Sequence, residues 1–555
     1  MPSSAAPVSF LEQAFLYQID RWQRSVLFLD ILRERANNMM AHDEAGMPPP
    51  LAFEYETVLD ARRFEMPANY ALLRITRCDD DRAEDCVDDN KPPVIIIDPR
   101  AGHGPGLGGF KRDSEVGMAL HEGHATYFVI FFPLPSPNQT LADVLHALRR
   151  FVEEVSNRHH GKAPVLYGNC QAGWASMLLA ADCEGLSGVT VLNGSPLSYW
   201  AGASDANPMR LGGGLMGGSW LAHWLADLGN GRLDGAWLVQ NFENLNPANT
   251  LWDKNYNVFA HIDTERERFL EFERWWTGYH FLSREEILSI IEDLFIGNKL
   301  ERGTMKICTD CYIDLTRIRN PIVIFASSSD NITPPHQALN WIPTVYPTTA
   351  DLKNAGQRIV YLLNTHVGHL GIFVSASVAK LEHRAILESI GDLDALQPGL
   401  YEMKISNPTG DPDCRKPQYT VSFEEREVEQ INYAYPERSF EKVQAVSEWN
   451  ELLYKTTISP WITAFANPWS AEILKRLHPM RIGTKMFSEK LNPWMWPLKM
   501  FAPFIAIVRL PVDETNEFVA MEGEAGASIS RTLDSYRKSR DSASEQLFST
   551  LYGVK

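Results

Sequence analysis

The chain has 555 residues, of which 45% are apolar, so it can bury a large core and divide into several domains. Its formal net charge of −18 excludes a nucleic-acid binder that relies on a basic surface. Seven cysteines in so long a chain do not suggest a disulfide framework. The chain lacks both a basic, signal-like N-terminus and an unbroken run of about 20 apolar residues, so we expect a cytoplasmic protein.

The first part of the chain alternates predicted strands with predicted helices. Residues 1–50 form a helical N-terminal segment, because apolar side chains recur there at helical spacing. A further helix is predicted over 140–159, with Thr140 as its cap. Strands are predicted over 51–59, 70–76, 94–97, 125–132, 164–167 and 188–192. This alternation indicates an α/β protein with a mainly parallel sheet and helices on both faces.

Residues 197–319 break the alternation, and we interpret them as a cap or lid inserted into the core. Two more predicted strands, 321–326 and 358–363, resume the pattern after the insertion. The core therefore comprises 51–196 and 320–385.

The pattern stops after about residue 385, and 386–555 is expected to be a mostly helical extension that ends in an amphipathic helix over 516–551. Within it, residues 494–510 are rich in Trp, Phe and Ile but interrupted by prolines and cations. Contact with a lipid or polymer surface is one interpretation of this stretch. Packing against the rest of the protein is the other, and we favour it.

Residues 165–174 have the layout of a nucleophile elbow. A short apolar run meets Gly168, Cys170 follows, and small residues then open a helix. An elbow holds its nucleophile on a sharp strand-to-helix turn, where the helix N-terminus favours a thiolate. A buried structural cysteine before a core helix is the alternative interpretation.

An activated cysteine needs a base, and the base needs an acid that orients it. In elbow-bearing hydrolases these residues follow in the order nucleophile, acid, histidine. Asp330 comes shortly after one predicted strand, and both His366 and His369 come shortly after the next. Because sites assemble at the carboxyl ends of parallel strands, we predict Cys170, Asp330 and His369 as catalytic residues. His369 is preferred over His366 because it lies deeper in its loop.

The reaction also needs N–H donors for a tetrahedral oxyanion. The elbow supplies the backbone N–H of Gln171, and the second donor is expected from the glycine-rich loop after Ile97, with Ala101 as the candidate. Further candidates to line the pocket are His103, Trp174 and His366.

Cys308 and Cys311 form a Cys-x-x-Cys pair. No second pair of Cys or His ligands follows nearby, so a zinc site is not expected and both are interpreted as ordinary residues. The sequence thus predicts neither a metal nor a cofactor.

Three segments resemble motifs of a known family. Residues 167–173, Tyr-Gly-Asn-Cys-Gln-Ala-Gly, resemble the lipase-like box Gly-x-Cys-x-Gly-Gly of polyhydroxyalkanoate synthases. Residues 330–334 resemble their Asp-His-Ile-x-Pro segment, and 368–370 their Gly-His-Ile. This likeness covers only the core, whereas most of the chain resembles the DUF3141 proteins, which are often labelled poly(3-hydroxyalkanoate) synthetase-like.

The resemblance implies an α/β-hydrolase fold with Cys170 as acyl acceptor, His369 as base and Asp330 as its orienting acid. It implies (R)-3-hydroxyacyl-CoA thioesters as donors and a hydroxyl group as acceptor, with acyl-CoA as substrate and no cofactor. Ala172 stands where the synthases have the first of two glycines, and Asn331 replaces the histidine after the aspartate. These departures bear more on polymerisation than on the triad.

Three functions therefore stay open. The first is an acyltransferase of the polyhydroxyalkanoate synthase type, and the second is a hydrolase with the same triad, such as a thioesterase or an esterase of polyesters or lactones. The third is a binding protein on a hydrolase scaffold. Expected partners are an acyl-CoA or ester substrate, a polyester granule or membrane surface, and a second copy in a homodimer.

Overall fold

The computed structural model describes residues 9–78, 81–82, 87–183, 185–204, 206–307, 311–406, 419–433 and 435–553. The chain divides into two compact units. The sheet unit comprises Pro49–Gly235, His280–Glu472 and Ser544–Lys555, and the helical unit comprises Met1–Pro48, Ala236–Tyr279 and Ile473–Ala543. Residues 236–279, which lie inside the predicted insertion 197–319, thus belong to the helical unit.

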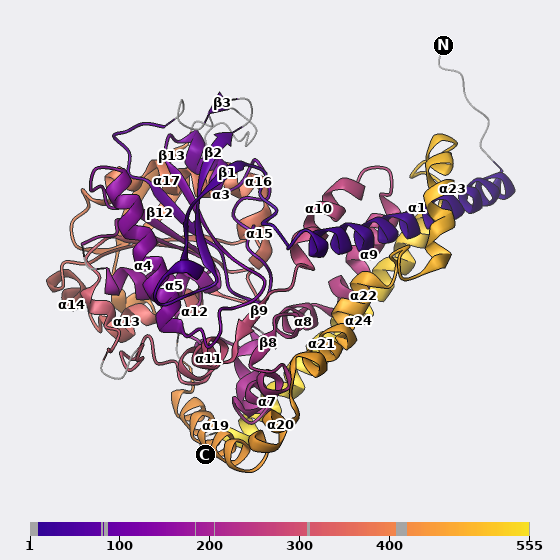
Figure 1. Ribbon diagram of the computed structural model, residues 1–555. Helices are drawn as coiled ribbons and strands as arrows, with labels where there is room; N and C mark the ends of the chain where they lie inside the picture. The colour runs from indigo at the N-terminus through magenta and orange to yellow at the C-terminus, as the bar shows by residue number, and fades with distance from the viewer. Residues whose placement is uncertain are drawn as a thin grey trace. The chain divides into compact units, whose positions relative to one another are not determined.

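A large sheet forms the centre of the sheet unit (Figure 1). Its strands are β1 (Glu54–Asp60), β2 (Tyr70–Cys78), β3 (Asp81–Arg82), β4 (Val94–Ile97), β5 (Thr126–Phe131), β6 (Val165–Asn169), β7 (Thr190–Asn193), β10 (Ile322–Ser327), β11 (Arg358–Asn364), β12 (Gly399–Ser406) and β13 (Thr420–Arg426). They lie in the order β1-β2-β5-β4-β6-β7-β10-β11-β12-β13, with β3 beside β2. Strands from β5 to β12 pair in parallel, whereas β1, β2 and β13 pair antiparallel. A separate pair is formed by β8 (Arg232–Asp234) and β9 (Phe281–Ser283).

The parallel strands are buried because helices cover them. Every residue of β4, β5, β6 and β10 is buried, which explains their continuous apolar runs. The longer helices of this unit include α4 (Leu141–Arg158), α5 (Gln171–Asp182), α7 (Trp220–Leu228) and α19 (Glu437–Thr457). The shorter ones include α3 (Glu115–His121), α6 (Gly212–Leu215), α11 (Arg284–Ser289), α12 (Pro335–Leu339), α13 (Trp341–Val345), α14 (Thr349–Asn354), α15 (His369–Val374), α16 (Ala376–Val378), α17 (Arg384–Glu388), α18 (Ile390–Leu393) and α20 (Ser459–Phe465).

The structure confirms every strand predicted from the sequence, with small shifts at the ends. It also confirms the helix predicted over 140–159, where Thr140 caps α4 by accepting the N–H of Asp143 while the Asp143 carboxylate accepts the N–H of Thr140. The α/β fold class predicted from the alternation is therefore present.

The expectation that the alternation ends near residue 385 is wrong. β12 extends the sheet in parallel beside β11, and β13 pairs with β12 at the edge. The signal is weak because β12 carries Glu402 and Lys404 between buried apolar residues, and β13 is largely exposed. Such half-polar strands, at the sheet edge or next to it, lack the continuous apolar run that marks β4 or β10.

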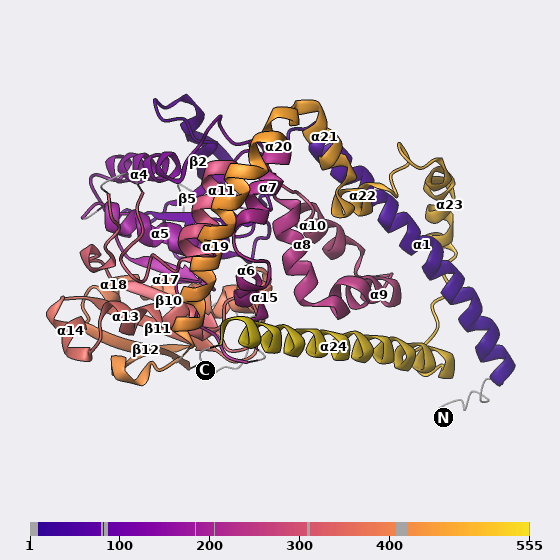
Figure 2. The ribbon, with the colours of Figure 1, turned by 90° about the horizontal axis from the view of Figure 1, so that it is seen from below.

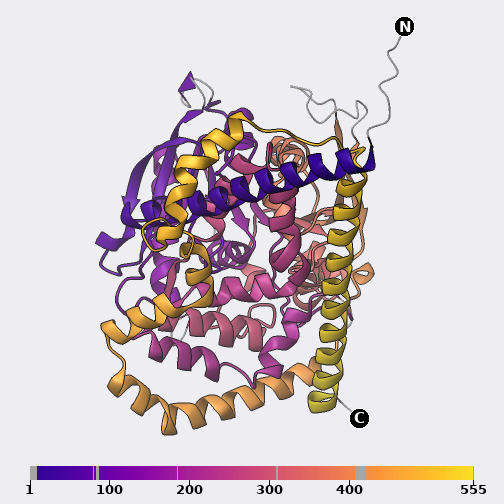
Figure 3. The same cartoon turned by 90° about the vertical axis from the view of Figure 1, so that its right-hand side faces the viewer.

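The helical unit is built around α1 (Phe10–Glu44). Its other helices are α8 (Ala236–Leu245), α9 (Lys254–Ala260), α10 (Arg266–Trp276), α22 (Pro479–Lys485), α23 (Trp496–Ile507) and most of α24 (Glu517–Tyr552), while α21 (Pro468–Leu477) runs across the boundary between the units. Figure 2 shows the long α1 and α24, and Figure 3 shows α23 crossing α1, with which it is in contact. An apolar core joins Ile31 and Leu32 of α1 to Val258, Ile262 and Phe269.

A buried ion pair fixes α24 to α1. The guanidinium of Arg24 lies 2.7 Å from Glu522, and Arg24 also donates to Asp20 one turn earlier at 2.7 Å. The helix predicted over 516–551 is thus confirmed as α24. No described helix is long and apolar enough to cross a membrane.

Residues 494–510 do not pack as the sequence interpretation favoured. Within α23 only Ala502 and Ile505 are buried, and most of the large apolar side chains are exposed. The helix is in contact with α1, and its Trp, Met and Phe side chains are exposed.

Candidate functional site

Cys170 stands on a strained turn between β6 and α5. Its φ of 48° and ψ of −117° are rare for a residue with a side chain. Backbone bonds on both sides hold this conformation: the Cys170 N–H donates to the Asn193 carbonyl at 2.8 Å, and the Gly173 N–H donates to the Cys170 carbonyl at 2.9 Å. The nucleophile elbow predicted from the sequence is therefore present as a geometry.

Two glycines allow β6 and α5 to meet at this turn. A Cβ on Gly168 would lie 2.5 Å from Ser176 Oγ and 2.8 Å from the Ala172 carbonyl oxygen. A Cβ on Gly173 would lie 2.0 Å from Ser195 Oγ. Both positions must therefore lack a side chain, which explains the glycines on either side of the cysteine.

The structure brings together all three residues predicted as catalytic. His369 Nε2 lies 3.2 Å from Cys170 Sγ, and His369 Nδ1 lies 2.7 Å from Asp330 Oδ2. The three side chains follow the carboxyl ends of β6, β10 and β11, and β7 lies between β6 and β10 in the sheet. All three are buried, with exposed fractions of 4%, 2% and 7% for Cys170, Asp330 and His369.

Asp330 is fixed by its own backbone surroundings. Its Oδ1 accepts the N–H groups of Ile332 and Thr333, each at 2.8 Å, so Oδ2 is left to face His369. The carboxylate accepts the Nδ1–H of His369, and this places Nε2 toward the cysteine sulfur.

The charges of the triad favour a protonated imidazole. Burial alone would lower the pKa of His369, but the carboxylate of Asp330 and a thiolate on Cys170 raise this pKa to about 10. The N-terminus of α5, which starts directly after Cys170, favours negative charge on the sulfur. The arrangement suits an imidazolium–thiolate pair.

A buried polar network that the sequence analysis missed lies beneath the elbow. Asn169 accepts a hydrogen bond from Asn193 at 3.0 Å and donates to both Asp98 and Glu115. Burial raises the pKa of Asp98 to about 6 and that of Glu115 well above its usual range. Asp98 accepts the backbone N–H groups of Gly106, Leu107 and Gly108.

This network fixes the shape of the glycine-rich loop that follows β4. A lone aspartate at the end of a strand carries no motif, so only the fold reveals its role. The predicted oxyanion donors, Gln171 and Ala101, lie at the start of α5 and in this loop, respectively. Their donor role stays a prediction.

The candidate pocket residues have different surroundings. Trp174 is buried, and its indole N–H donates to Gln171 Oε1 at 2.8 Å. Tyr199, which the sequence analysis did not single out, donates to the same oxygen at 3.1 Å. His103 is buried in the loop after β4, whereas His366 is exposed and lies outside the triad.

One group of described residues has the spacing of metal ligands. Ligand atoms of His223, Glu292 and Glu451 lie within 4.8 Å of one another. However, Arg284 donates to His223 Nδ1 at 3.3 Å, so Nε2 carries the proton that bonds Glu292 at 2.6 Å. Glu451 pairs with Lys455, and the cluster is therefore an ion-pair network.

The Cys-x-x-Cys pair is only partly described. Cys308 lies outside the described residues, and Cys311 is disulfide-bonded, so it is not the ordinary residue that the sequence suggested.

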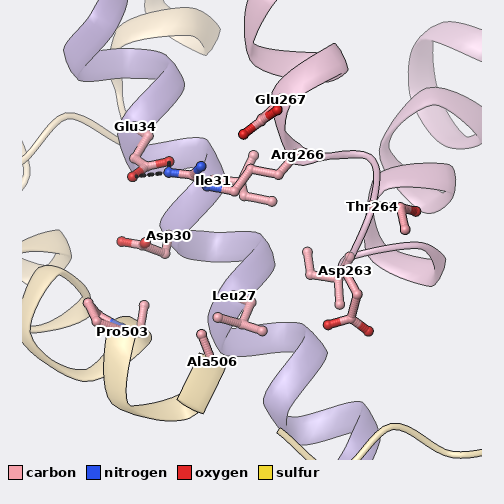
Figure 4. A pocket seen from close by; sticks show the side chains of 12 residues that line it. Leu27, Asp30, Ile31, Glu34, Asp263, Thr264, Arg266, Glu267, Pro503 and Ala506 are labelled. Atoms are coloured by element: carbon pink, nitrogen blue, oxygen red, sulfur yellow. Dashed lines mark hydrogen bonds and ion pairs between the residues drawn. The ribbon is translucent and has the colours of Figure 1, made fainter.

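A pocket of about 580 Å³ lies within the helical unit between α1, α10 and α23 (Figure 4). Three of its carboxylates are held in ion pairs: Asp30 with Arg33, Glu34 with Arg266, and Asp263 with Arg509. It contains no nucleophile paired with a base. The triad in the sheet unit is the stronger candidate for an active site.

A mainly parallel sheet with a cysteine on a strained strand-to-helix elbow, followed by an aspartate and a histidine after later strands, is the arrangement of the α/β-hydrolase fold. Within that fold, the chain belongs to the family described as "Protein of unknown function (DUF3141)", which matches residues 20–555. This confirms the resemblance to that family seen in the sequence.

The chain is also similar to individual proteins. The chain is 43% identical over 564 residues to the "Uncharacterized protein in ackA 5'region" of Rhizobium meliloti, covering 100% of this chain and 76% of that protein. Among solved structures, a putative lipase from Acinetobacter baumannii is 12% identical with a TM-score of 0.33, covering 71% of this chain and 99% of that one. A thioesterase domain from the curacin biosynthetic pathway is also 12% identical with a TM-score of 0.33, covering 61% and 99%, respectively.

Proposed function

We propose that the chain is an acyltransferase that carries an acyl group on Cys170. The observation that carries this proposal is the buried relay in which Cys170 Sγ lies 3.2 Å from His369 Nε2 and His369 Nδ1 lies 2.7 Å from Asp330. Nucleophile, base and orienting acid thus stand in the order that covalent acyl transfer requires.

In the first step, the Cys170 thiolate attacks the carbonyl carbon of an acyl thioester. The N–H of Gln171, together with an N–H from the loop after β4, would hold the oxyanion of the tetrahedral intermediate. The intermediate collapses with cleavage of the bond to the leaving sulfur, which takes the proton of the His369 imidazolium. The products are an acyl-cysteine and a free thiol.

In the second step, a hydroxyl group attacks the acyl-cysteine. His369 accepts the hydroxyl proton, and Asp330 stabilises the imidazolium that forms. Collapse of the second tetrahedral intermediate forms an ester, breaks the carbon–sulfur bond and restores the Cys170 thiolate. Burial of all three side chains favours transfer over hydrolysis because it limits the access of water.

The donor that we propose is an (R)-3-hydroxyacyl-CoA. This choice rests on the resemblance of the segments around Cys170, Asp330 and His369 to those of polyhydroxyalkanoate synthases. A cysteine suits such a donor because exchange of one thioester for another is nearly balanced in free energy, so the acyl group stays reactive toward an alcohol.

The test is a CoA-release assay with 3-hydroxybutyryl-CoA, run together with intact-mass analysis of the protein. We expect the wild type to release CoA and carry a hydroxyacyl adduct, and Cys170→Ala to do neither. Cys183→Ala is the matched control, since Cys183 is also a buried free thiol but burial raises its pKa to about 12. It should retain both signals.

The product distinguishes the alternatives. Release of CoA with formation of an ester supports transfer, whereas stoichiometric 3-hydroxybutyric acid shows that the same triad is a hydrolase. Absence of both CoA release and adduct would overturn the CoA-thioester proposal.

A further inference from the structure

An apolar face of the helical unit is turned outward at α23 and the short turn before it. Six large side chains form this face, with exposed fractions between 59% and 84%. We call the α23 face the set formed by Trp494, Trp496, Met500, Phe501, Phe504 and Ile507.

The helix exposes most of its large apolar side chains. Ala502 and Ile505 are buried, and Ala502, Pro503 and Ala506 line the pocket beside α1 (Figure 4). A surface helix of a globular protein normally does the reverse, placing its large apolar side chains toward the core. The side chains of α23 are therefore oriented for an apolar environment outside the unit.

The length of α23 fits an interfacial position. Its 12 residues span about 18 Å at the helical rise, less than the roughly 30 Å of a bilayer's hydrocarbon core. Trp494 and Trp496 lie at its start, and Trp is the residue that favours the boundary between lipid chains and headgroups. A short helix with aromatic and aliphatic residues on one face lies in that boundary plane.

Lysines beside the α23 face favour an anionic lipid surface as its partner. Residues 473–512 contain seven Lys and Arg residues and one Glu, and several of these cations pair with acids, among them Lys485 with Asp43 and Arg509 with Asp20. Lys499 on α23 lies 3.2 Å from Glu489, and Lys490 lies 2.7 Å from Glu44. Exposed pairs of this kind contribute little, so lipid phosphates can compete for both lysines.

The same charges disfavour the other occupants. A symmetric dimer built on the α23 face would offer Lys490 and Lys499 no phosphate group in exchange for their weak surface pairs. A neutral polyester surface offers the lysines no counter-charge. We propose that the α23 face binds the surface of a bilayer that contains anionic phospholipids, independently of the chemistry at Cys170.

Vesicle flotation of the full-length protein tests this proposal. The probes are vesicles of phosphatidylcholine with phosphatidylglycerol, vesicles of phosphatidylcholine alone, and particles of poly(3-hydroxybutyrate). The test variant is F501S/F504S/I507S. The matched control is L134S/M216S/L251S, which removes the same number of exposed large apolar side chains elsewhere.

We expect the wild type and the control to float with anionic vesicles, and more weakly with phosphatidylcholine alone. Partitioning of the α23 variant should fall by about 10-fold or more, because it loses the apolar area that enters the lipid. Sedimentation velocity of the wild type and the α23 variant reports self-association.

Three results would overturn the proposal. The first is no flotation of the wild type, or equal flotation of the wild type and the α23 variant. The second is a wild-type dimer that does not float and that the α23 variant dissociates, which would assign the face to a second copy. The third is binding to polyester particles but not to vesicles.

Discussion

The elbow of the sheet unit and α23 of the helical unit depart from the usual distribution of side chains in opposite directions. Around Cys170 the interior holds polar and ionisable groups, among them Asp98, Asn169 and His369. On α23 the exterior holds large apolar groups, among them Trp494 and Phe504. Burying a polar group costs free energy unless it is partnered, and exposing a large apolar side chain forgoes the gain of burial.

The two regions manage these costs differently. The buried groups at the elbow form hydrogen bonds to one another and to backbone N–H groups, so their cost is offset within the unit. The α23 face has no such compensation among its own atoms. A buried polar group is thus explained by its partners within the unit, whereas an exposed apolar face points to something outside the chain.

The largest effect is expected on the rate of CoA release, and it should come from Asp330→Asn. The amide can still accept the backbone N–H groups of Ile332 and Thr333, but it cannot hold His369 in the tautomer that faces Cys170. We expect kcat/KM for CoA release to fall about 1,000-fold with little loss of folding. Asp394→Asn, at an exposed aspartate, is the control, and a full-rate D330N variant would remove Asp330 from the triad.

A smaller effect is expected on the pH dependence of folding stability, and it comes from the buried His383. Tyr167 on the strand of the nucleophile donates to His383 Nδ1 at 2.7 Å, and His383 Nε2–H donates to the Ile372 carbonyl on α15 at 2.7 Å. Burial lowers the pKa of His383 to about 4. An unfolded chain has a histidine pKa of about 6.5, so between these values the unfolded state binds more protons.

Stability contributed by neutral His383 is therefore present above pH 6.5 and lost as the pH falls through about 4. The full loss corresponds to about 3 kcal/mol. Urea unfolding of the wild type, His383→Gln and the exposed-site control His121→Gln at several pH values measures it. The wild type and H121Q should lose more stability on acidification than H383Q, and parallel curves for all three would contradict the assignment.

Much of the candidate site could be predicted because the sequence patterns that mark it span only a few neighbouring residues. The β-branched run at β4 marks a strand buried on both faces. The elbow is marked by Cys170 between Gly168 and Gly173, two positions that have no room for a Cβ. Asp330 and His369 were found because each follows a strand. Their order along the chain predicts which would be acid and which base, and the structure brings both side chains close to Cys170.

The remaining features depend on contacts between residues far apart in sequence. Asp98 and Glu115 meet Asn169 from 71 and 54 residues away, and Tyr199 reaches Gln171 from within the predicted insertion. β12, next to the edge strand β13, was missed because Glu402 and Lys404 interrupt its apolar run. The composition of residues 494–510 is compatible with packing against the protein and with contact with an external surface. Only the fold determines which side chains of α23 are buried and which are exposed.

A substitution that adds a side chain at Gly168 should lower both the folding stability and the rate of CoA release. In Gly168→Ala the new methyl group would lie 2.5 Å from Ser176 Oγ and 2.8 Å from the Ala172 carbonyl, so β6 and α5 must separate. We expect the free energy of unfolding to fall by about 1–3 kcal/mol, with loss of CoA release, as the elbow relaxes. Differential scanning calorimetry and the CoA assay measure the two changes.

Gly391→Ala is the matched control, because no atom lies within 4 Å of the position its Cβ would take in α18. It should retain activity and keep or slightly raise stability. Equal stability losses in both variants would show that G168A acts through general glycine-to-alanine effects and not through crowding at the elbow.

The smallest effect should come from Phe504→Ser on the α23 face. Phe504 is 60% exposed, so its removal should change the free energy of unfolding by less than about 0.5 kcal/mol. Ile505, the next residue, is 6% exposed, and Ile505→Ser should cost about 2–4 kcal/mol because it leaves a cavity and buries a hydroxyl. Urea unfolding in the absence of lipid compares the two variants directly. A large loss in F504S would mean that the face is covered by the protein itself, and the contrast between the elbow and α23 would then disappear.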